Sequence, residues 1–413
     1  MTLQLQSAAG LLALCLLAWA CGGFRRGVTL RVVVAGLAGQ LALGAAMLHV
    51  APFRAAFSYV GDAVSALARA TTAGTSLVFG YLGGGPLPFV EPFPGAAFIL
   101  FFQALPLVLL VGALSALLYH WRVLPLLVGV MGRIVTAGFG LGGAAGFSIA
   151  ANVFVGMVEA PLLIRAWLAR LTRSEIFVVM VAGLATISGN TLVVYATLLA
   201  PVVPDAAGQL LAASLIAAPA SVLAAMLMIP PEPGFVPDPA QAKAAPLYTS
   251  SMEALVQGTM DGLQLLLGIM ATLIVFVALV ALVNLAIEPL TGMSLQSLAG
   301  WVFRPLALAM GVPWAESAII GASLGVKLVI NEFVAYLNLA QSGGAGLSER
   351  SRLILTYALC GFTNIGSLGI MLGGMCAMCP ERRADIVALG WPSLLAATLA
   401  CCMVGATVGI LTP

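Results

Sequence analysis

The chain consists of long apolar stretches separated by short charged or polar segments. Eight of its uncharged intervals are long enough to cross a bilayer, for which about 20 apolar residues in a helix suffice. These intervals are 1–24, 32–53, 92–121, 176–204, 206–231, 262–287, 353–380 and 386–413. The pattern predicts an all-α polytopic membrane protein with eight transmembrane helices, whose two termini lie on the same side of the membrane.

The basic residues between the intervals predict the orientation of the chain. Arg25 and Arg26 follow the first interval, and Arg382 and Arg383 separate the last two. Because cytoplasmic loops carry an excess of arginine and lysine, these loops are expected inside and both termini outside. The first interval lacks a basic segment before it, so it is expected to be a retained span of the cytoplasmic (inner) membrane and not a signal peptide.

Several segments do not fit a simple span and divide the chain into parts. Residues 54–69 alternate apolar and small polar side chains at helical spacing, which predicts a helix along the membrane interface. The region around 230–252 is rich in proline and is expected to be a cytoplasmic linker. Two apolar segments interrupted by polar residues are expected to be re-entrant hairpins, which are tolerated in a membrane only where protein or a water-filled cavity surrounds the broken backbone. Residues 1–90 are expected to hold the N-terminal spans and the interfacial helix, on the scaffold side. Residues 91–229 are expected to hold a hairpin at about 134–164 and an interrupted helix at about 176–204. After the linker, residues 253–413 are expected to hold a hairpin at about 317–347 and an interrupted helix at about 353–380.

The two hairpins share a sequence pattern. Asn152-Val153-Phe154-Val155-Gly156 in the first matches Asn331-Glu332-Phe333-Val334-Ala335 in the second at Asn, Phe and Val. Gly183, which opens GLATISG, follows Asn152 by 31 residues, and Gly361, which opens GFTNIGS, follows Asn331 by 30. The predicted topology gives the repeats opposite orientations. Inverted repeats with broken helices are typical of secondary transporters, which bind substrate near the membrane midplane.

Composition excludes other classes of protein. Hydrophobic residues make up 62% of the 413 residues and charged residues 8%, the mean hydropathy is +1.11, and the net charge is +2. Too few polar side chains remain to cover a water-soluble globule, and no basic cluster indicates a nucleic-acid partner. Cys376 and Cys379 form a C-x-x-C without a second pair, and the G-x-G-x-x-G at Gly138 has no preceding strand, so neither zinc or redox chemistry nor a dinucleotide cofactor is expected.

The candidate chemistry lies near the hairpins and the helix breaks. Glu159 and Glu332 are carboxylates at membrane depth, where an ionised group normally faces a cavity or a partner, and they suit vicinal sugar hydroxyls or a cation. A structural pairing with Lys327 or a backbone amide is the alternative. Neutral oxygens near the breaks suit sodium, although isolated Ser and Thr residues more often bond back to their own helix. These oxygens belong to Asn152, Thr186, Ser188, Asn364 and Ser367.

Four motifs resemble the concentrative nucleoside transporter family: ANVFVGMVEAPLLIR from Ala151, GLATISG, INEFVAY from Ile330 and CGFTN from Cys360. The likeness extends from Leu30 to about Gly390. It implies a homotrimer in which each protomer has a scaffold and a mobile domain that carries the substrate by an elevator-type displacement. Sodium drives transport in most members of the family and protons in some.

The resemblance also implies site residues. Glu332, Asn364 and Ser367 would read the ribose hydroxyls, with Phe362 against the nucleoside and Thr191 at the pocket wall. Glu159 would lie on the nucleobase side. The implied sodium site comprises Asn152 and Val155 of the first hairpin with Thr186 and Ile187 of the interrupted helix.

One departure from the family lies directly before Glu159. The family usually has Gln-Thr there, and this chain has Met157-Val158. An apolar wall discriminates between substrates more weakly than a hydrogen-bonding one, so we expect an altered base preference: broader selectivity, or a modified or purine base read by Asn190 and Thr191.

The sequence therefore predicts a sodium-coupled nucleoside symporter without an enzymatic activity or a cofactor. A proton-coupled symporter with Glu159 or Glu332 as the carrier is the alternative within transport. A membrane receptor or enzyme that binds nucleosides without moving them is the alternative of another class.

Overall fold

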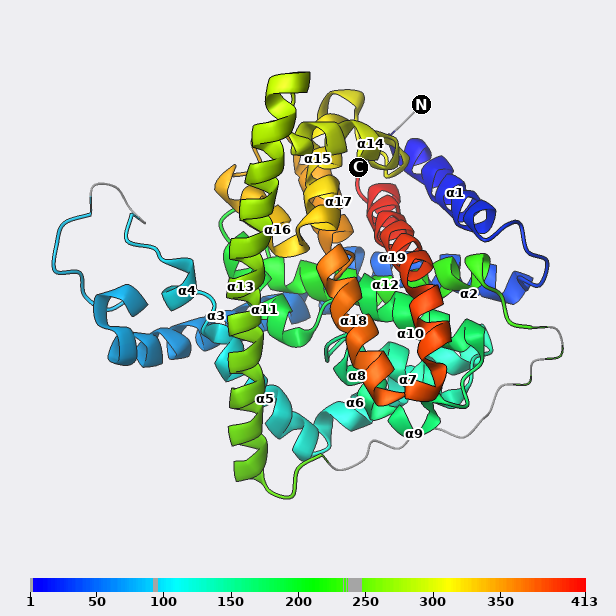
Figure 1. Ribbon diagram of the computed structural model, residues 1–413, viewed down its shortest axis with the longest axis horizontal. Coiled ribbons are helices and arrows are strands. Elements are labelled where there is room, and N and C mark those ends of the chain that lie inside the picture. The colour runs from blue at the N-terminus through cyan, green and yellow to red at the C-terminus, as the bar shows by residue number, and fades with distance from the viewer. Residues whose placement is uncertain (1–2, 92–95, 233, 235, 237–246) are drawn as a thin grey trace.

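The structure is a computed structural model that describes residues 3–91, 96–232, 234, 236 and 247–413. Within these residues the regular elements are all helical, as the apolar pattern predicts. Figure 1 shows long helices running in several directions around a central group of shorter ones. Most of the expected linker at 230–252 lies outside the described residues.

The helices before the linker cover five of the predicted spans, two of them as pairs of consecutive helices. They are α1 (Leu3–Cys21), α2 (Leu30–His49), α3 (Ala51–Phe79), η1 (Gly80–Gly83), α4 (Leu100–Gln103), α5 (Leu107–His120), α6 (Val123–Phe139), α7 (Gly143–Ala151), α8 (Glu159–Leu163), α9 (Arg165–Leu168), α10 (Arg173–Ala185), α11 (Gly189–Leu199) and α12 (Ala206–Met228).

The helices after the linker begin with the longest of those described. They are α13 (Ser251–Thr291), α14 (Leu295–Ala309), α15 (Trp314–Val329), α16 (Glu332–Gln341), α17 (Glu349–Leu359), α18 (Ile365–Met378), η2 (Pro380–Arg382) and α19 (Arg383–Leu411).

Seven helical segments of the described chain are long and apolar enough to cross a membrane, or eight if the bent pair α14 and α15 is one span. These seven coincide with seven of the eight predicted intervals. The remaining interval, 353–380, contains α17 and α18, which are separated by the non-helical residues 360–364. The chain is thus a multi-pass, all-α membrane protein.

The first hairpin begins later than the predicted residue 134. Residues 134–139 continue α6, which ends where Gly140 adopts a left-handed conformation with φ 70°. Glycine tolerates this conformation without a steric penalty, so it commonly ends a helix. The hairpin arms are therefore α7 on one side and α8 with α9 on the other, and residues 152–158 connect them.

The second hairpin and both broken helices occupy the regions in which the sequence has polar interruptions. The arms of the hairpin are α15 and α16, which meet at Ile330 and Asn331. The first broken helix is α10 followed by α11, with Thr186–Ser188 between them. The second is α17 followed by α18, which succeed one another from top to bottom at the centre of Figure 1.

Two carboxylates fix the positions of the hairpins relative to the broken helices. Glu175, in the first turn of α10, accepts the amide of Gly142 at the start of α7 at 3.0 Å. Glu316, in the first turn of α15, accepts the Ser348 hydroxyl at the start of α17 at 3.0 Å. In each half of the chain, a carboxylate on one element thus accepts hydrogen bonds from the other and ties the hairpin to the helix that follows it.

Candidate functional site

The two broken helices cross at their interruptions. Gly361, in the second break, has φ 148°, and a β-carbon there would lie 2.7 Å from the carbonyl oxygen of Ala185 at the end of α10. The thiol of Cys401 on α19 lies 3.5 Å from the Cys360 carbonyl and 3.8 Å from the Ala185 carbonyl. Backbone from the two halves of the chain therefore meets at this point, and only glycine fits at position 361.

Three helices begin around this crossing with a side chain that caps their first turn. Ser188 begins α11 and accepts the Thr191 amide, Asn331 begins α16 and accepts the Val334 amide at 2.9 Å, and Asn364 begins α18 and accepts the Ser367 amide at 2.7 Å. These caps satisfy backbone donors that a helix end leaves unpaired. They explain why polar residues occur at these breaks in an apolar sequence.

Glu332 is the centre of the polar contacts in the second hairpin. Its carboxylate is buried, with 3% of the residue exposed, and both oxygens are hydrogen-bonded. Oε2 accepts the side-chain amide of Asn364 at 2.9 Å. Oε1 accepts the hydroxyl of Tyr195 on α11 at 2.7 Å. Two of the predicted ribose residues, Glu332 and Asn364, are therefore brought into direct contact.

Lys327 does not provide the ion pair that was the structural alternative for Glu332. Its ammonium is buried and donates to the carbonyl of Ala358 at 2.9 Å, in the last turn of α17. A cation is favourable there because the helix dipole places partial negative charge at that end. The contact ties α15 to α17.

The other predicted substrate residues differ in burial. Ser367 and Thr191 are buried, Phe362 is half-buried, and Glu159 is exposed. The Thr191 hydroxyl bonds locally, to the Ser188 carbonyl at 3.0 Å. The Glu159 carboxylate lies over Gly156, where an added β-carbon would be 2.1 Å from it.

Met157 and Val158 contact two different helices. A β-carbon at Gly183 on α10 would lie 3.3 Å from the Met157 β-carbon, and one at Gly374 on α18 would lie 2.8 Å from a Val158 methyl group. Met157 is buried and Val158 is half-buried. The two apolar residues thus fill the space between the first hairpin and both broken helices.

The residues of the implied sodium site form a second polar group. Asn152, Thr186 and Ile187 are buried, and Val155 is half-buried. The Thr186 hydroxyl donates to the Asn152 carbonyl at 3.2 Å and to its own helix, at Ala182, at 2.9 Å. Thr186 therefore bonds back to its own helix, as threonine commonly does, and also contacts the first hairpin.

The Asn152 side chain is one of five among the described residues that keep a buried polar atom without a hydrogen-bond partner, and the only one of them with two such atoms. It is 1% exposed, and within the described part of the chain neither its Oδ1 nor its Nδ2 has a hydrogen-bond partner. Leaving a buried polar atom unpaired costs about 1–3 kcal/mol, so such an atom calls for a ligand. An amide oxygen, a threonine hydroxyl and backbone carbonyls are the hard, neutral oxygens that suit a sodium ion.

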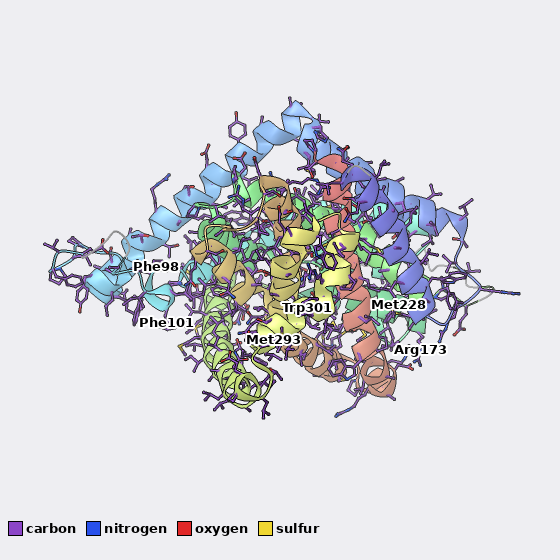
Figure 2. The ribbon with its side chains drawn as sticks, turned by 90° about the horizontal axis from the view of Figure 1, so that it is seen from above. Phe98, Phe101, Arg173, Met228, Met293 and Trp301 are labelled. Carbon is purple, nitrogen blue, oxygen red and sulfur yellow. The ribbon has the colours of Figure 1, made fainter. Side chains whose placement is uncertain are left out.

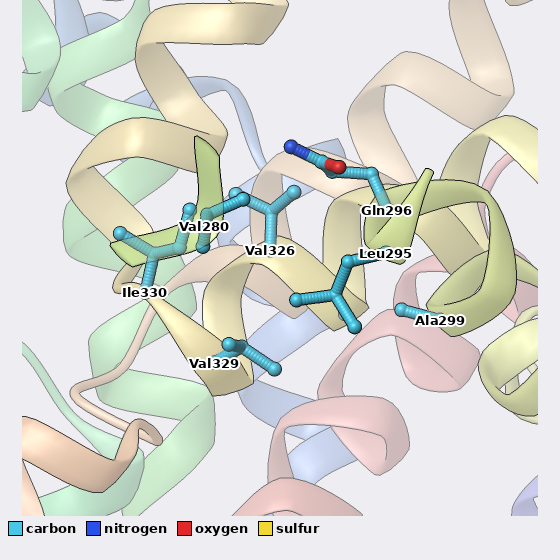
Figure 3. A pocket seen from close by; sticks show the side chains of 8 residues that line it. Val280, Leu295, Gln296, Ala299, Val326, Val329 and Ile330 are labelled. Atoms are coloured by element: carbon cyan, nitrogen blue, oxygen red, sulfur yellow. The ribbon is translucent and has the colours of Figure 1, made fainter. Parts of the chain in front are cut away.

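A small apolar pocket lies between the second hairpin, α13 and α14. It is lined by Val280 of α13, by residues of α14, and by Val326, Val329 and Ile330 of the hairpin (Figure 3). None of the predicted nucleoside residues lines it. The pocket is instead a contact between α13, α14 and the hairpin.

Three family models match consecutive parts of the chain. A model described as the Na+ dependent nucleoside transporter N-terminus matches residues 9–82, one described as nucleoside recognition matches 101–202, and the Na+ dependent nucleoside transporter C-terminus matches 209–409. The nucleoside permease NupC of Helicobacter pylori is 31% identical to this chain over 98% of it and 97% of its own length. This chain belongs to the concentrative nucleoside transporter family. Sodium/nucleoside cotransporter 1 of Mus musculus is 33% identical over 92% of this chain and 60% of its own length.

Solved structures in the family have the same fold. CNTnw in an inward-facing, substrate-bound state is 34% identical and matches the whole of both chains with a TM-score of 0.92. CNTnw variants in outward-facing and intermediate states match with TM-scores of 0.90 and 0.89. The relatives are transporters and not enzymes, so this chain is a nucleoside transporter of the Na+-dependent family with an elevator-type fold.

Tyr195 is the site residue that the sequence analysis missed. It follows Thr191 by four residues on α11, so both lie on the same face of the helix. This spacing could have indicated that Tyr195 reaches the same region. Its contact with Glu332, 137 residues further along the chain, is a tertiary feature that no local pattern contains.

Proposed function

We propose that this protein is a sodium-coupled symporter that imports nucleosides across the cytoplasmic membrane. The observation that supports sodium as the coupling ion is Asn152: both polar atoms of its buried side-chain amide are unpaired, and its backbone carbonyl accepts the Thr186 hydroxyl. Sodium would bind to Asn152, Val155, Thr186 and Ile187. The family model and the mouse relative, both of which name sodium, support this choice over protons.

The substrate would bind between the first hairpin and the second. Glu332 would accept hydrogen bonds from the ribose hydroxyls, together with Asn364 and Ser367, because each carboxylate oxygen keeps a lone pair after its contact with Tyr195 or Asn364. Phe362 would pack against the nucleoside, and Thr191 would line the wall. Met157, Val158 and Glu159 would meet the base.

The mechanism would be an elevator displacement in a homotrimer. The inward-facing, intermediate and outward-facing structures of CNTnw support alternating access of this kind. In the most apolar 18-residue segment of α13, only 11% of the residues are buried within this chain. Such a large exposed apolar surface supports contact with lipid or with other protomers. Bound sodium and nucleoside would move together, and each would tighten the binding of the other.

Both termini would face the outside of the cell. The contacts of Arg350 support a common side for them, because its guanidinium donates to the Ser7 hydroxyl at 3.0 Å and to the Thr412 carbonyl at 3.3 Å. The two ends also lie near one another at the top of Figure 1.

The test is uptake of labelled nucleosides into proteoliposomes under an imposed sodium gradient or an imposed proton gradient. We expect accumulation with sodium and none with protons alone. Asn152→Ala should raise the sodium concentration for half-maximal uptake at least tenfold, since an unpaired amide that contacts the ion contributes about 1.5–3 kcal/mol. Asn338→Ala, which removes an exposed amide on α16, is the matched control.

Accumulation driven by a proton gradient without sodium would replace this proposal with proton coupling. Binding without accumulation under either gradient would favour a receptor. Equal sodium dependence of Asn152→Ala and the wild type would remove Asn152 from the cation site.

A further inference from the structure

Glu332 is held by one donor from each half of the chain. Asn364, which belongs to the second broken helix, donates to Oε2, and Tyr195, which belongs to the first, donates to Oε1 at 2.7 Å. A hydrogen bond to a carboxylate in a buried site is strong and directional. The orientation of the carboxylate therefore depends on α11 as much as on the second broken helix.

The Tyr195 hydroxyl has a fixed position. The residue is 3% exposed, and its ring lies 5.0 Å from the ring of Tyr336 and 5.9 Å from that of Phe333. The Tyr336 hydroxyl is itself bonded to the Thr356 carbonyl at 2.8 Å. Because a phenol oxygen lies on the axis of its ring, a buried ring that is held by neighbouring rings keeps the oxygen in one place.

The other end of α11 is attached to the first hairpin. The amide of Gly189, the first residue of the helix, donates to the Phe154 carbonyl at 3.0 Å, between Asn152 and Val155 in the chain. Thr186, Ile187 and Ser188 precede Gly189 at the break. Tyr195 follows Ser188 by seven positions, which is about 10 Å along a helix.

We propose that Tyr195 is a positioning residue that aims the Glu332 carboxylate at the ribose and transmits cation binding to it. This inference rests on the proposed sodium-coupled function and adds the physical link between the two ligands. An ion at Asn152 and Thr186 orders the break and the start of α11, and the rigid helix places the Tyr195 hydroxyl on Oε1. Sodium then tightens nucleoside binding through Tyr195, and by linkage the nucleoside tightens sodium binding by the same factor.

The test compares Tyr195→Phe with Tyr336→Phe in proteoliposomes. Both changes delete one buried phenol hydroxyl, but only the first touches Glu332. For Tyr195→Phe we expect the KM of a ribonucleoside to rise about tenfold and the preference for it over its 2′- and 3′-deoxy analogues to fall. The sodium concentration for half-maximal uptake should also respond less to nucleoside concentration. Tyr336→Phe should retain the preference and the mutual dependence.

A double-mutant cycle separates positioning from a general structural role. In a Glu332→Gln background, Tyr195→Phe should have little further effect on the choice between ribo- and deoxynucleosides, because the carboxylate on which it acts is gone. Additive effects would mean that Tyr195 acts elsewhere and would overturn the inference. Unchanged KM, preference and sodium response in Tyr195→Phe would do the same.

Two further controls keep the outcome decisive. If Tyr195→Phe does not fold, 3-fluorotyrosine at position 195 retains the ring and makes the hydroxyl a more acidic donor. The KM of the ribonucleoside must then change, whereas 3-fluorotyrosine at position 336 must leave it unchanged. An equal change of KM for the two substitutions would contradict the role of Tyr195. A wild-type protein that accumulates no nucleoside with sodium would overturn the proposed function and this inference together, while normal wild-type transport with an inert Tyr195 would overturn this inference alone.

Discussion

At the scale of single residues, the candidate site combines groups that bond to one another with groups that do not. Glu332 has both oxygens in contact with donors, whereas the Asn152 amide has no partner among the described residues. A prearranged carboxylate recognises hydroxyl groups without first having to be ordered, and an unpaired amide gains most from a ligand. We therefore expect the two residues to serve different ligands.

We expect the base preference to depend on Met157 and Val158. Met157 is buried against α10, whereas Val158 is half-buried beside α18, so Val158 is the more accessible to a base. A site that reads a base through hydrogen bonds rejects the wrong base far more strongly than an apolar wall does. We expect Val158→Thr to change the ratio of pyrimidine to purine nucleoside uptake by about tenfold. Met157→Gln should change this ratio by less when it is made alone than when it is combined with Val158→Thr.

The measurement is the KM for a panel of pyrimidine, purine and modified nucleosides, with Val130→Thr as the control. Val130 is exposed on α6, so the control makes the same chemical change away from the site. The same order of nucleosides in the double variant and the wild type would show that these two positions do not set base selectivity.

At the scale of elements, the breaks were predictable because their polar residues have a local purpose. Asn331, Asn364 and Ser188 begin helices, and such caps leave a recognisable polar residue within an apolar stretch. The helix α14 was not predicted, because Arg304 interrupts its apolar pattern and places it between the intervals. The sequence could not indicate that Arg304 lies between two tryptophans, 3.6 Å from the ring of Trp314 and 5.1 Å from that of Trp301, since this pairing depends on the bend before α15.

The crossing of the two broken helices depends on Gly361. A side chain at this position would both strain the backbone at φ 148° and approach the Ala185 carbonyl to 2.7 Å. We expect Gly361→Ala to destabilise the protein by about 2 kcal/mol and to reduce nucleoside uptake strongly, because residues at both breaks would shift. Thermal unfolding in detergent and initial rates of uptake would measure these effects.

Gly369→Ala is the matched control on α18, since a β-carbon there meets no atom within 4 Å. The helical conformation of this residue also accepts alanine, which has the higher helix propensity. Similar stability and uptake for Gly361→Ala and Gly369→Ala would mean that the breaks do not require close contact between the two halves.

At the scale of the whole molecule, α5 and α13 form a closely packed pair. A β-carbon at Gly258 on α13 would lie 2.6 Å from the Gly112 carbonyl on α5, and one at Gly262 would lie 2.9 Å from the Val108 carbonyl. Small residues four apart allow membrane helices to approach this closely. We therefore expect α5 and α13 to behave as one rigid unit.

The molecule is wide when it is seen from above. Phe98 and Phe101, which precede α5 in the chain, lie on the opposite side from Arg173 and Met228, and Trp301 of α14 lies between them (Figure 2).

The contact between α13 and the second hairpin is the place to test relative motion. Val280 on α13 and Ile330 at the hairpin tip line the same small pocket, close to Val326 (Figure 3). If the hairpin carries the nucleoside past a fixed α13, this contact must break in every transport cycle. A short, cleavable linker between Val280→Cys and Ile330→Cys should therefore abolish uptake, and cleavage of the linker should restore it.

A linker within the α5–α13 pair provides the control. Trp121, at the end of α5, donates to the Ser251 hydroxyl at the start of α13 at 3.1 Å, so Trp121→Cys with Ser251→Cys can be joined in the same way. This linker should leave uptake close to that of the unlinked variant, because both residues belong to the rigid unit. Wild-type protein treated with the same reagent accounts for the native cysteines. Full uptake with Val280 and Ile330 joined would mean that the second hairpin and α13 move together, and the moving boundary would then have to lie elsewhere in the molecule.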